Sequence, residues 1–340
     1  MSSHPYRQQL DLAVIGTGAV SPAGVGVAAL KNAPQPVETP FLDGSGKTWP
    51  VLKVDLKDAA FAGWQKEARL RRSSPISLFL IEAAEQALAG AGLSGEERKR
   101  TGVVAAFSTG SLVYSRRFFE AILRQGRKAA SPALFPETVF NSPLSHVAAT
   151  LGLGGAAYAL VGDETAWIAA LKTAWLWLRQ GEADQVLVLG AEEFDAVILD
   201  TYRAAGWLGK KSSLRPSEGA GAVLVRAARA GEGAVIAAGT DGQVYRNRHQ
   251  LETAGKQMLA DQAEGALLFQ TATRQGMKKI EEALAPRFRT IDQDVPYLGE
   301  AFAASASWQT LRALALGKTD GPLLVPVWGS NHQIGLLELK

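Results

Sequence analysis

The sequence predicts a layered α/β fold built from two similar halves. Three observations indicate this architecture. The segments DQVLVLGA and GAGAVLVRAA are apolar at almost every position, which is typical of strands in a sheet covered on both faces. Helical patterns alternate with these strands along the chain, as they do in layered α/β proteins. From about residue 230 the same order of elements returns in shorter form, which indicates an internal pseudo-duplication.

The two halves are expected over residues 1–226 and 227–340, packed together as one compact unit. The chain has 340 residues, of which 47% are hydrophobic and 20% are charged. A chain of this length and composition can bury a substantial core, so disorder is not expected to dominate it.

The elements of the first half follow from periodicity and from turn residues. Apolar residues at Leu78, Ile81 and Leu88 recur at helical spacing, and Gly90 and Gly92 end that helix. By the same criteria the first half begins with a strand over 10–22, a helix over 75–92, a buried strand over 101–110, an amphipathic helix over 115–126 and a helix over 140–155.

Residues 158–193 are predicted to form a strand, a tight turn, a helix and a second strand. The segment Trp167–Leu178 is apolar on nearly every face, and such a helix belongs between the layers of a protein. The turn before it holds Asp163 and Glu164. A buried turn at a helix N-terminus is a common seat for a catalytic nucleophile, yet this one presents two carboxylates.

The second half repeats this order of strands and helices over fewer residues. A strand over 233–242 echoes the first strand, and a helix is predicted over 272–285. A largely apolar helix over 303–317 is expected to be the counterpart of the central helix of the first half. The segment 322–340 closes the chain as a hairpin-like pair of strands.

Composition excludes several classes of function. The chain has no cysteine, so it has no disulfide, no thiolate metal site and no cysteine nucleophile. No apolar run reaches the length that spans a bilayer, and MSSHPYRQQL lacks the features of a signal peptide, so we expect a cytoplasmic protein. The net charge is +3, and the basic clusters are not spaced with aromatic residues as on a nucleic-acid surface. We expect no metal and no cofactor. The only candidate dinucleotide fingerprint, GTGAVS, is interrupted by Ser21.

Four motifs occur in a fixed order: VIGTGAVSPAG, SPALFPETVFNSPLSHVAATLGLGG, GEADQVLVLGAEE and RPSEGAGAVLV. They cover most of residues 10–226, and in this order they resemble the β-ketoacyl synthases of fatty acid and polyketide assembly. Weaker similarity in GEAFAASASWQTLRALALGK and VWGSNHQIGLLEL extends to the C-terminus. The resemblance implies a thiolase-like αβαβα fold whose second half is shortened.

The residues that carry catalysis in that family are replaced here. Counting from Ser131 without a gap, the position of the family's cysteine falls on Glu164. The second histidine and its lysine map to Glu300 and Val295, and the gating phenylalanine maps to Val327. The segment that should hold the family's first histidine is deleted. Condensation needs a thiolate to carry the acyl chain and imidazoles to stabilise developing charge, so we expect no catalytic residues for this reaction.

Two interpretations of Glu164 stay open. In the first, Glu164 is a structural plug that fills the place of the acylated thiol and caps the central helix. In the second, Glu164 and Glu300 share a proton and act as an acid/base pair. The histidines do not restore the missing imidazoles. We expect His146 to be a packed structural residue, and the remaining three lie in the N-terminal tail, on a surface loop and in the terminal turn: His4, His249 and His332.

Family members without the cysteine are chain-length factors, which pair with a catalytic ketosynthase in type II polyketide and aryl polyene systems. The resemblance implies a non-catalytic subunit that forms a heterodimer, with a homodimer as the alternative, and meets acyl carrier protein through its partner. The segment LFPETVF would supply a wall of the partner's acyl pocket through Leu134, Phe135, Thr138 and Phe140, although ordinary core or interface packing would explain these residues equally well. The alternatives are an enzyme with altered acyl-thioester chemistry at Glu164 and Glu300, such as thioester hydrolysis, and a homodimeric scaffold. Neither nucleic acid nor membrane is an expected partner.

Overall fold

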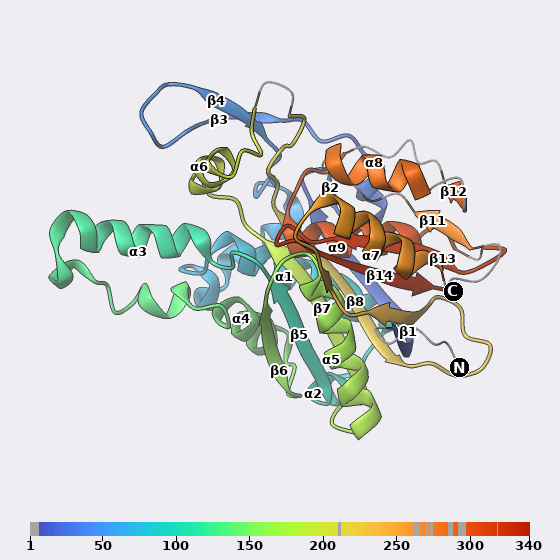
Figure 1. The fold of residues 1–340 in the computed structure, drawn as a ribbon. Coiled ribbons are helices and arrows are strands. Elements are labelled where there is room, and N and C mark those ends of the chain that lie inside the picture. The colour runs from blue at the N-terminus through green and yellow to red at the C-terminus, as the bar shows by residue number, and fades with distance from the viewer. Residues whose placement is uncertain are drawn as a thin grey trace.

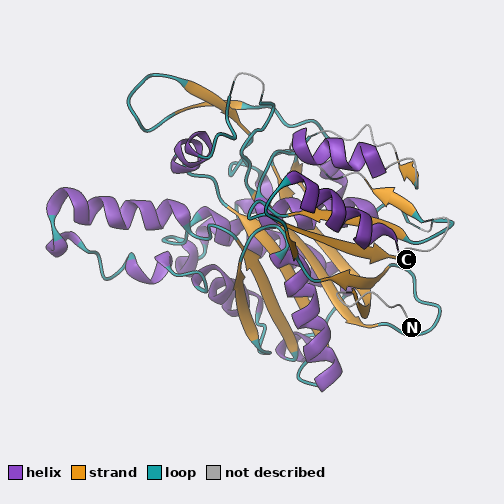
Figure 2. Cartoon of the chain, viewed as in Figure 1, coloured by secondary structure: helices purple, strands orange, loops and turns teal. Residues whose placement is uncertain are grey.

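The structure of the chain is a computed structural model. It describes residues 7–209, 212–260, 266–269, 271, 275–284, 288–291, 297–317 and 319–340. The chain has a layered α/β fold of the thiolase type, in which strands alternate with helical layers (Figure 1, Figure 2). The expected fold class is therefore confirmed.

The first half contains the longest strand and the helices that cover it. Its elements are β1 (Arg7–Ser21), β2 (Gly24–Val25), β3 (Val37–Pro40), β4 (Thr48–Val51), α1 (Pro75–Ala91), α2 (Gly95–Lys99), β5 (Thr101–Phe107), α3 (Leu112–Gln125), the 3-10 turn η6 (Phe135–Thr138), α4 (Ser142–Leu151), β6 (Ala157–Val161), α5 (Ala166–Gln180), β7 (Gln185–Glu192), α6 (Val197–Ala204) and β8 (Gly219–Ala227).

The second half is shorter and ends in an antiparallel pair of strands. Its elements are β9 (Val235–Thr240), β10 (Gln243–Val244), α7 (Arg248–Ala260), β11 (Leu267–Phe269), α8 (Gln275–Leu284), β12 (Arg289–Ile291), α9 (Phe302–Leu314), β13 (Leu323–Trp328) and β14 (Gln333–Leu339). The pair β13–β14 is the hairpin that the sequence predicts.

One hydrogen-bonded sheet joins the two halves. Within the described residues its strand order is β12-β11-β13-β14-β9-β1-β8-β7-β5-β6. The long strand β1 makes the link, because it pairs antiparallel with β8 of the first half and with β9 of the second. The division at residues 226 and 227 stays a prediction.

Alternate residues of each strand face different helical layers. In β7, Val188 contacts the central core around α5 and α9, whereas Leu187 contacts the core beneath α1. In β13, Val325 faces the central core and Leu324 faces a third core beneath α7. Both faces of the sheet are therefore covered, which explains why these strands are apolar at successive positions.

The glycines of VIGTGAV allow a helix to lie directly on a strand. A Cβ atom added at Gly16 or Gly18 would overlap the carbonyl oxygen of Ala87 or Ala83 in α1. The G-x-G pattern thus serves close helix–strand packing.

Two features of the first half lie at its surface, namely a projecting helix and the last strand of the sheet. Helix α3 and the chain that returns through η6 project outward as an extended pair (Figure 1). We call residues 112–138 the arm. At the end of the sheet lies β6, which among the described strands pairs only with β5 and carries exposed Tyr158 and Val161.

Several predicted elements are confirmed, and one expectation is only partly right. Helices α1, α4 and α5 end on left-handed glycines, namely Gly92, Gly152 and Gly181. The first two turns of α5 are buried as expected, but Leu176 is 42% exposed and its neighbours Trp175 and Trp177 are only half-buried. The second half of α5 therefore reaches the surface instead of lying between layers. In the part of the chain that the structure describes, no helix is long and apolar enough to cross a membrane.

Candidate functional site

The turn between β6 and α5 places two carboxylates inside the protein. Asp163 is 6% exposed and Glu164 is 3% exposed, and the helix begins two residues later at Ala166. This is the buried turn that the sequence predicts. Its burial follows from its place between the end of an edge strand and the central helix.

Asp163 stabilises the turn that precedes the central helix. One oxygen of its carboxylate accepts hydrogen bonds from the backbone N–H of Thr165 at 2.9 Å and from the Thr165 hydroxyl at 2.6 Å. The other oxygen accepts from the backbone N–H of Asn331 at 3.1 Å. Asp163 thus links the turn before α5 to the β13–β14 turn, and the capping role expected of Glu164 stays a prediction.

Glu164 reaches across the molecule to the turn between β13 and β14. Its Oε2 accepts a hydrogen bond from the backbone N–H of Ser330 at 2.6 Å. Together with the bond from Asn331 to Asp163, this contact ties the β13–β14 turn to the N-terminus of α5. A Cβ atom at Gly329 would collide with the Asp163 carboxylate, so the two segments are in close contact.

This arrangement ties two distant segments of the chain together through buried carboxylates. A buried carboxylate that accepts a backbone N–H is an acceptor in a structural contact, and any anhydride that it formed would be hydrolysed readily. Among the described residues, no group of His, Asp and Glu side chains is placed to hold a metal ion.

Glu300 is also buried, at 3% exposure, and its backbone is held by the segment before β8. Its N–H donates to the carbonyl of Arg215 at 2.8 Å, and its carbonyl accepts from the N–H of Ser217 at 2.9 Å. Two residues later Phe302 has φ of 42°, an uncommon conformation for a bulky side chain. The pairing of Glu300 with Glu164 as an acid/base dyad stays a prediction.

The remaining degenerate positions are distributed as follows. Val327 is 1% exposed in β13 and faces the central core. Val295 lies outside the described residues. Val327 thus occupies a packed position and has no polar chemistry.

The residues predicted to form the pocket wall lie in two places, on the arm and at its base. Phe135 lies on the arm, where its ring centroid is 5.7 Å from that of Phe118 in α3, and it is 55% exposed. Leu134 and Thr138 flank it at the two ends of η6 and are half-buried. Phe140 lies at the base, where a Cβ atom at Gly110 would come within 2.6 Å of its ring.

The histidines are structural or exposed. His146 is buried in α4, and its Nε2 lies 3.0 Å from both oxygens of the Glu137 carboxylate in η6, so it holds that turn to the body. His332 stacks on Tyr245 in the β13–β14 turn. His249 is exposed on helix α7, where a surface loop was expected. His4 lies outside the described residues.

A group of buried carboxylates was not recognised from the sequence. Glu192 ends β7, Glu193 follows it directly, and Glu218 precedes β8. Burial raises the pKa of Glu192 and that of Glu193 to about 7, and the pKa of Glu218 to about 6. These residues lie inside the motifs GAEE and EGAG, and their place in these motifs was the only feature of the sequence that could have pointed to them.

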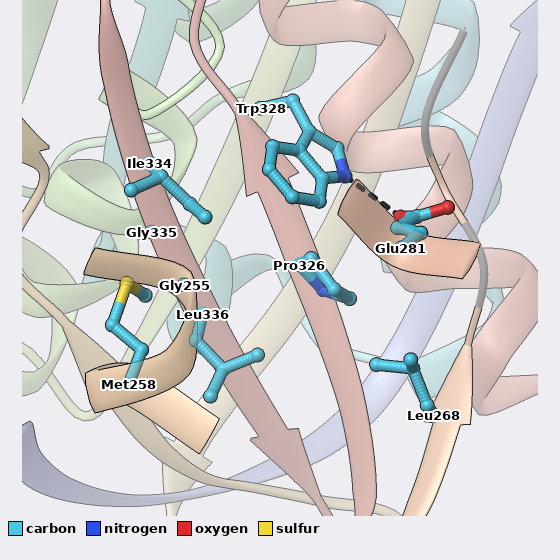
Figure 3. Close-up of a pocket in the computed structure, with 9 residues that line it drawn as sticks. All are labelled: Gly255, Met258, Leu268, Glu281, Pro326, Trp328, Ile334, Gly335 and Leu336. Carbon is cyan, nitrogen blue, oxygen red and sulfur yellow. Dashed lines mark hydrogen bonds between the residues drawn. The ribbon is translucent and has the colours of Figure 1, made fainter. Parts of the chain in front are cut away.

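A small apolar pocket lies in the second half, beneath α7 and α8 (Figure 3). Figure 3 shows Met258, Leu268 and Leu336 around it, with the Trp328 indole N–H donating to the buried Glu281 carboxylate at 2.7 Å. The space has room for little more than one water molecule, so it is too small for an acyl chain.

Comparison with known proteins agrees with this fold. The β-ketoacyl synthase N-terminal domain matches residues 43–239. The ishigamide ketosynthase/chain length factor is 22% identical, with a TM-score of 0.77 over 97% of this chain and 99% of its own. A ketosynthase in complex with its chain length factor from Xenorhabdus doucetiae is 14% identical, with a TM-score of 0.75 over 100% and 99% of the two chains.

A third solved structure holds a type II polyketide synthase acyl-carrier protein in complex with its ketosynthase. It is 17% identical, with a TM-score of 0.72 over 98% of this chain and 99% of its own. None of the curated proteins matches this chain in sequence. At these identities the solved structures share its fold, and the domain match spans more than half of the 340 residues. The chain therefore belongs to the β-ketoacyl synthase family.

Proposed function

We propose that this chain is a non-catalytic, chain-length-factor-like subunit. It pairs with a cysteine-containing β-ketoacyl synthase and shapes that partner's acyl pocket in polyketide biosynthesis of the aryl polyene type or in fatty acid biosynthesis. The observation that carries the proposal is Glu164. In a chain without cysteine, a buried carboxylate bonded to Ser330 lies at the position that the resemblance assigns to the family's cysteine.

The edge strand β6 supports pairing with a second subunit. Its sequence AYALV has no charge, and Tyr158 and Val161 are 55% and 56% exposed. Natural proteins protect free strand edges with charges, proline or bulges, and β6 has none of these devices. An apolar, unprotected edge is suited to being covered by another chain.

The arm supports the same conclusion. Large apolar side chains are exposed along the arm and at its base: Phe119, Leu123, Phe135, Val139 and Phe140. Several exposed large apolar side chains on one projecting segment are typical of a protein–protein interface. The solved ketosynthase/chain length factor pairs of the same fold are consistent with a ketosynthase as the partner, and with acyl carrier protein meeting the pair. A cytoplasmic location stays a prediction.

Co-expression with a cysteine-containing β-ketoacyl synthase tests the pairing. We expect a stable 1:1 complex by native mass spectrometry. Val161→Lys should abolish the complex because it places a charge in the covered edge, whereas Val244→Lys, at a 73% exposed strand position in the second half, should not. Recovery of this chain only as a homodimer would contradict the heterodimer and favour the scaffold alternative.

The altered-enzyme alternative makes a separate prediction. If Glu164 and Glu300 form an acid/base pair, the purified chain should hydrolyse acyl thioesters, and Glu164→Gln should abolish that activity. Under the proposed function the purified chain releases no free thiol above the background rate. A thiol-release assay on model acyl thioesters distinguishes the two.

A further inference from the structure

The arm is attached to the body by consecutive buried carboxylates at the end of β7. Glu192 and Glu193 are 1% and 2% exposed. In the hydrogen bonds that the structure shows for these two carboxylates, every donor is neutral, either a backbone N–H or a hydroxyl group. These donors come from segments that are distant in sequence, so the two residues join several elements at one point.

Glu193 serves two helices at once. One oxygen accepts from the backbone N–H of Val113, in the first turn of α3, at 2.7 Å. The other accepts from the backbone N–H of Ile76, in the first turn of α1, at 3.0 Å. The hydroxyl of Ser74 also donates to this carboxylate.

The two helices lack caps of their own. Within the described part of the chain, neither Ser74 at the start of α1 nor Ser111 at the start of α3 caps its helix with its side chain. The first N–H groups of a helix have no partner inside the helix, and a carboxylate is a favourable acceptor for them. Glu193 therefore acts as a shared N-cap that fixes α3 relative to α1.

Glu192 holds the residues that lead from β5 into the arm. Its carboxylate accepts from the backbone N–H of Ser108, from the N–H of Thr109 at 3.0 Å and from the Thr109 hydroxyl at 2.6 Å. One turn further along α3, the guanidinium of Arg116 donates to Asp195 at 2.7 Å. The residues at the end of β7 and just after it are thus hydrogen-bonded to the first two turns of the arm and to the residues before it.

We propose that Glu192 and Glu193 are positioning residues that set the direction of the arm relative to the body. Anchoring of the arm is a property of the isolated chain. The same residues then control where the arm's apolar side chains enter a partner's acyl tunnel, and hence the length of the partner's product. This consequence rests on the proposed function.

The anchoring is tested by hydrogen exchange on the full-length chain without a partner. Glu193→Gln keeps the size of the side chain but turns one oxygen into an NH₂ group, which cannot accept from a helix N–H. We expect amides in the first turns of α3 and α1 to exchange about tenfold faster, as for the loss of a helix cap. Glu281→Gln, an equally buried control in α8, should leave these amides unchanged.

A second variant separates local capping from general damage. Adding Ser111→Asp to Glu193→Gln gives α3 its own cap and should restore protection of α3 but not of α1. Unchanged exchange in Glu193→Gln, or equal acceleration in the strands of the core, would overturn the anchoring. Glu192→Gln provides an independent variant if Glu193→Gln does not fold.

Product analysis of the reconstituted pair tests the consequence. Glu193→Gln should broaden the distribution of acyl chain lengths, whereas Glu281→Gln should not. A faster-exchanging arm with an unchanged product distribution would overturn the link to chain length while leaving the pairing intact. Failure of the wild-type chain to form a complex would instead count against the proposed function and leave the anchoring result standing.

Discussion

At the level of single residues, the turn between β6 and α5 is stabilised by carboxylates that bond to a turn far along the chain. Glu164 and Asp163 accept backbone N–H groups of Ser330 and Asn331. Glu164 therefore has a structural contact to lose.

Replacing Glu164 tests this contact. Glu164→Ala leaves the N–H of Ser330 without its acceptor in a buried site, which should lower the free energy of unfolding by about 1–3 kcal/mol. Glu164→Gln retains an amide oxygen and should cost less. Urea unfolding of the three proteins measures both effects. Equal stability of Glu164→Ala and the wild type would show that the contact is not structural.

The buried carboxylates predict an unusual dependence of stability on pH. Burial raises the pKa of Glu192 and Glu193 to about 7 and that of Glu218 to about 6, whereas a free glutamate has a value of 4.5. Between pH 4.5 and 7 the folded state then holds protons that the unfolded state has released. The contribution of these groups to stability therefore decreases as pH rises through this range.

Unfolding in urea at pH 5.5 and at pH 8 measures this effect. We expect Glu192→Gln to reduce the loss of stability between the two pH values, because a neutral amide cannot titrate. Neutral donors surround Glu192 and Glu193, and the negative charge of Glu218 adds to the rise in the pKa of Glu193. The positive charge of Lys53 opposes the rise in the pKa of Glu218. An identical pH profile in Glu192→Gln and the wild type would contradict the assignment.

At the level of elements, the contact between α1 and β1 depends on glycine. Gly16→Ala should lower the free energy of unfolding by about 2–3 kcal/mol, because the added Cβ overlaps the backbone of α1. Gly90→Ala lies near the end of α1 with no atom close to the added Cβ, so it should raise stability by about 0.5–1 kcal/mol. Thermal unfolding of both variants checks the pair. A stable Gly16→Ala protein would show that the helix can move away from the strand.

Phe140 tests the contribution of the arm's base to the pocket. Its ring packs against Gly110, where β5 ends and the arm begins. In the reconstituted pair, Phe140→Ala should lengthen the products because it removes part of the wall. Leu316→Ala, at an exposed position after α9, is the control. Products of unchanged length, read by mass spectrometry, would remove Phe140 from the pocket.

At the level of the whole molecule, the layered core could be predicted from the sequence, and the contacts between distant segments could not. The runs in β7 and β8 are apolar at every position because both faces are covered, and this pattern is visible in the letters. The burial of Glu164 could also be expected from its place before an apolar helix. Its acceptance of the Ser330 N–H could not, because the two residues are 166 positions apart.

The arm and the carboxylates that hold it were missed for related reasons. The helical period of α3 predicts an amphipathic helix, but it does not indicate that the helix leaves the body. Glu192 and Glu193 stand in a quoted motif, yet their role depends on which helix N-termini meet them. These contacts depend on how α1 and α3 pack against the end of β7, and no local sequence pattern predicts that packing.

The most direct test of the central claim is the condensation rate of the reconstituted pair, measured with acyl and malonyl thioesters. We predict that Glu164→Gln and Glu300→Gln in this chain leave the rate unchanged, whereas replacing the partner's cysteine by alanine abolishes it. A loss of tenfold or more on changing Glu164 or Glu300, or carbon–carbon bond formation by this chain alone, would contradict the account.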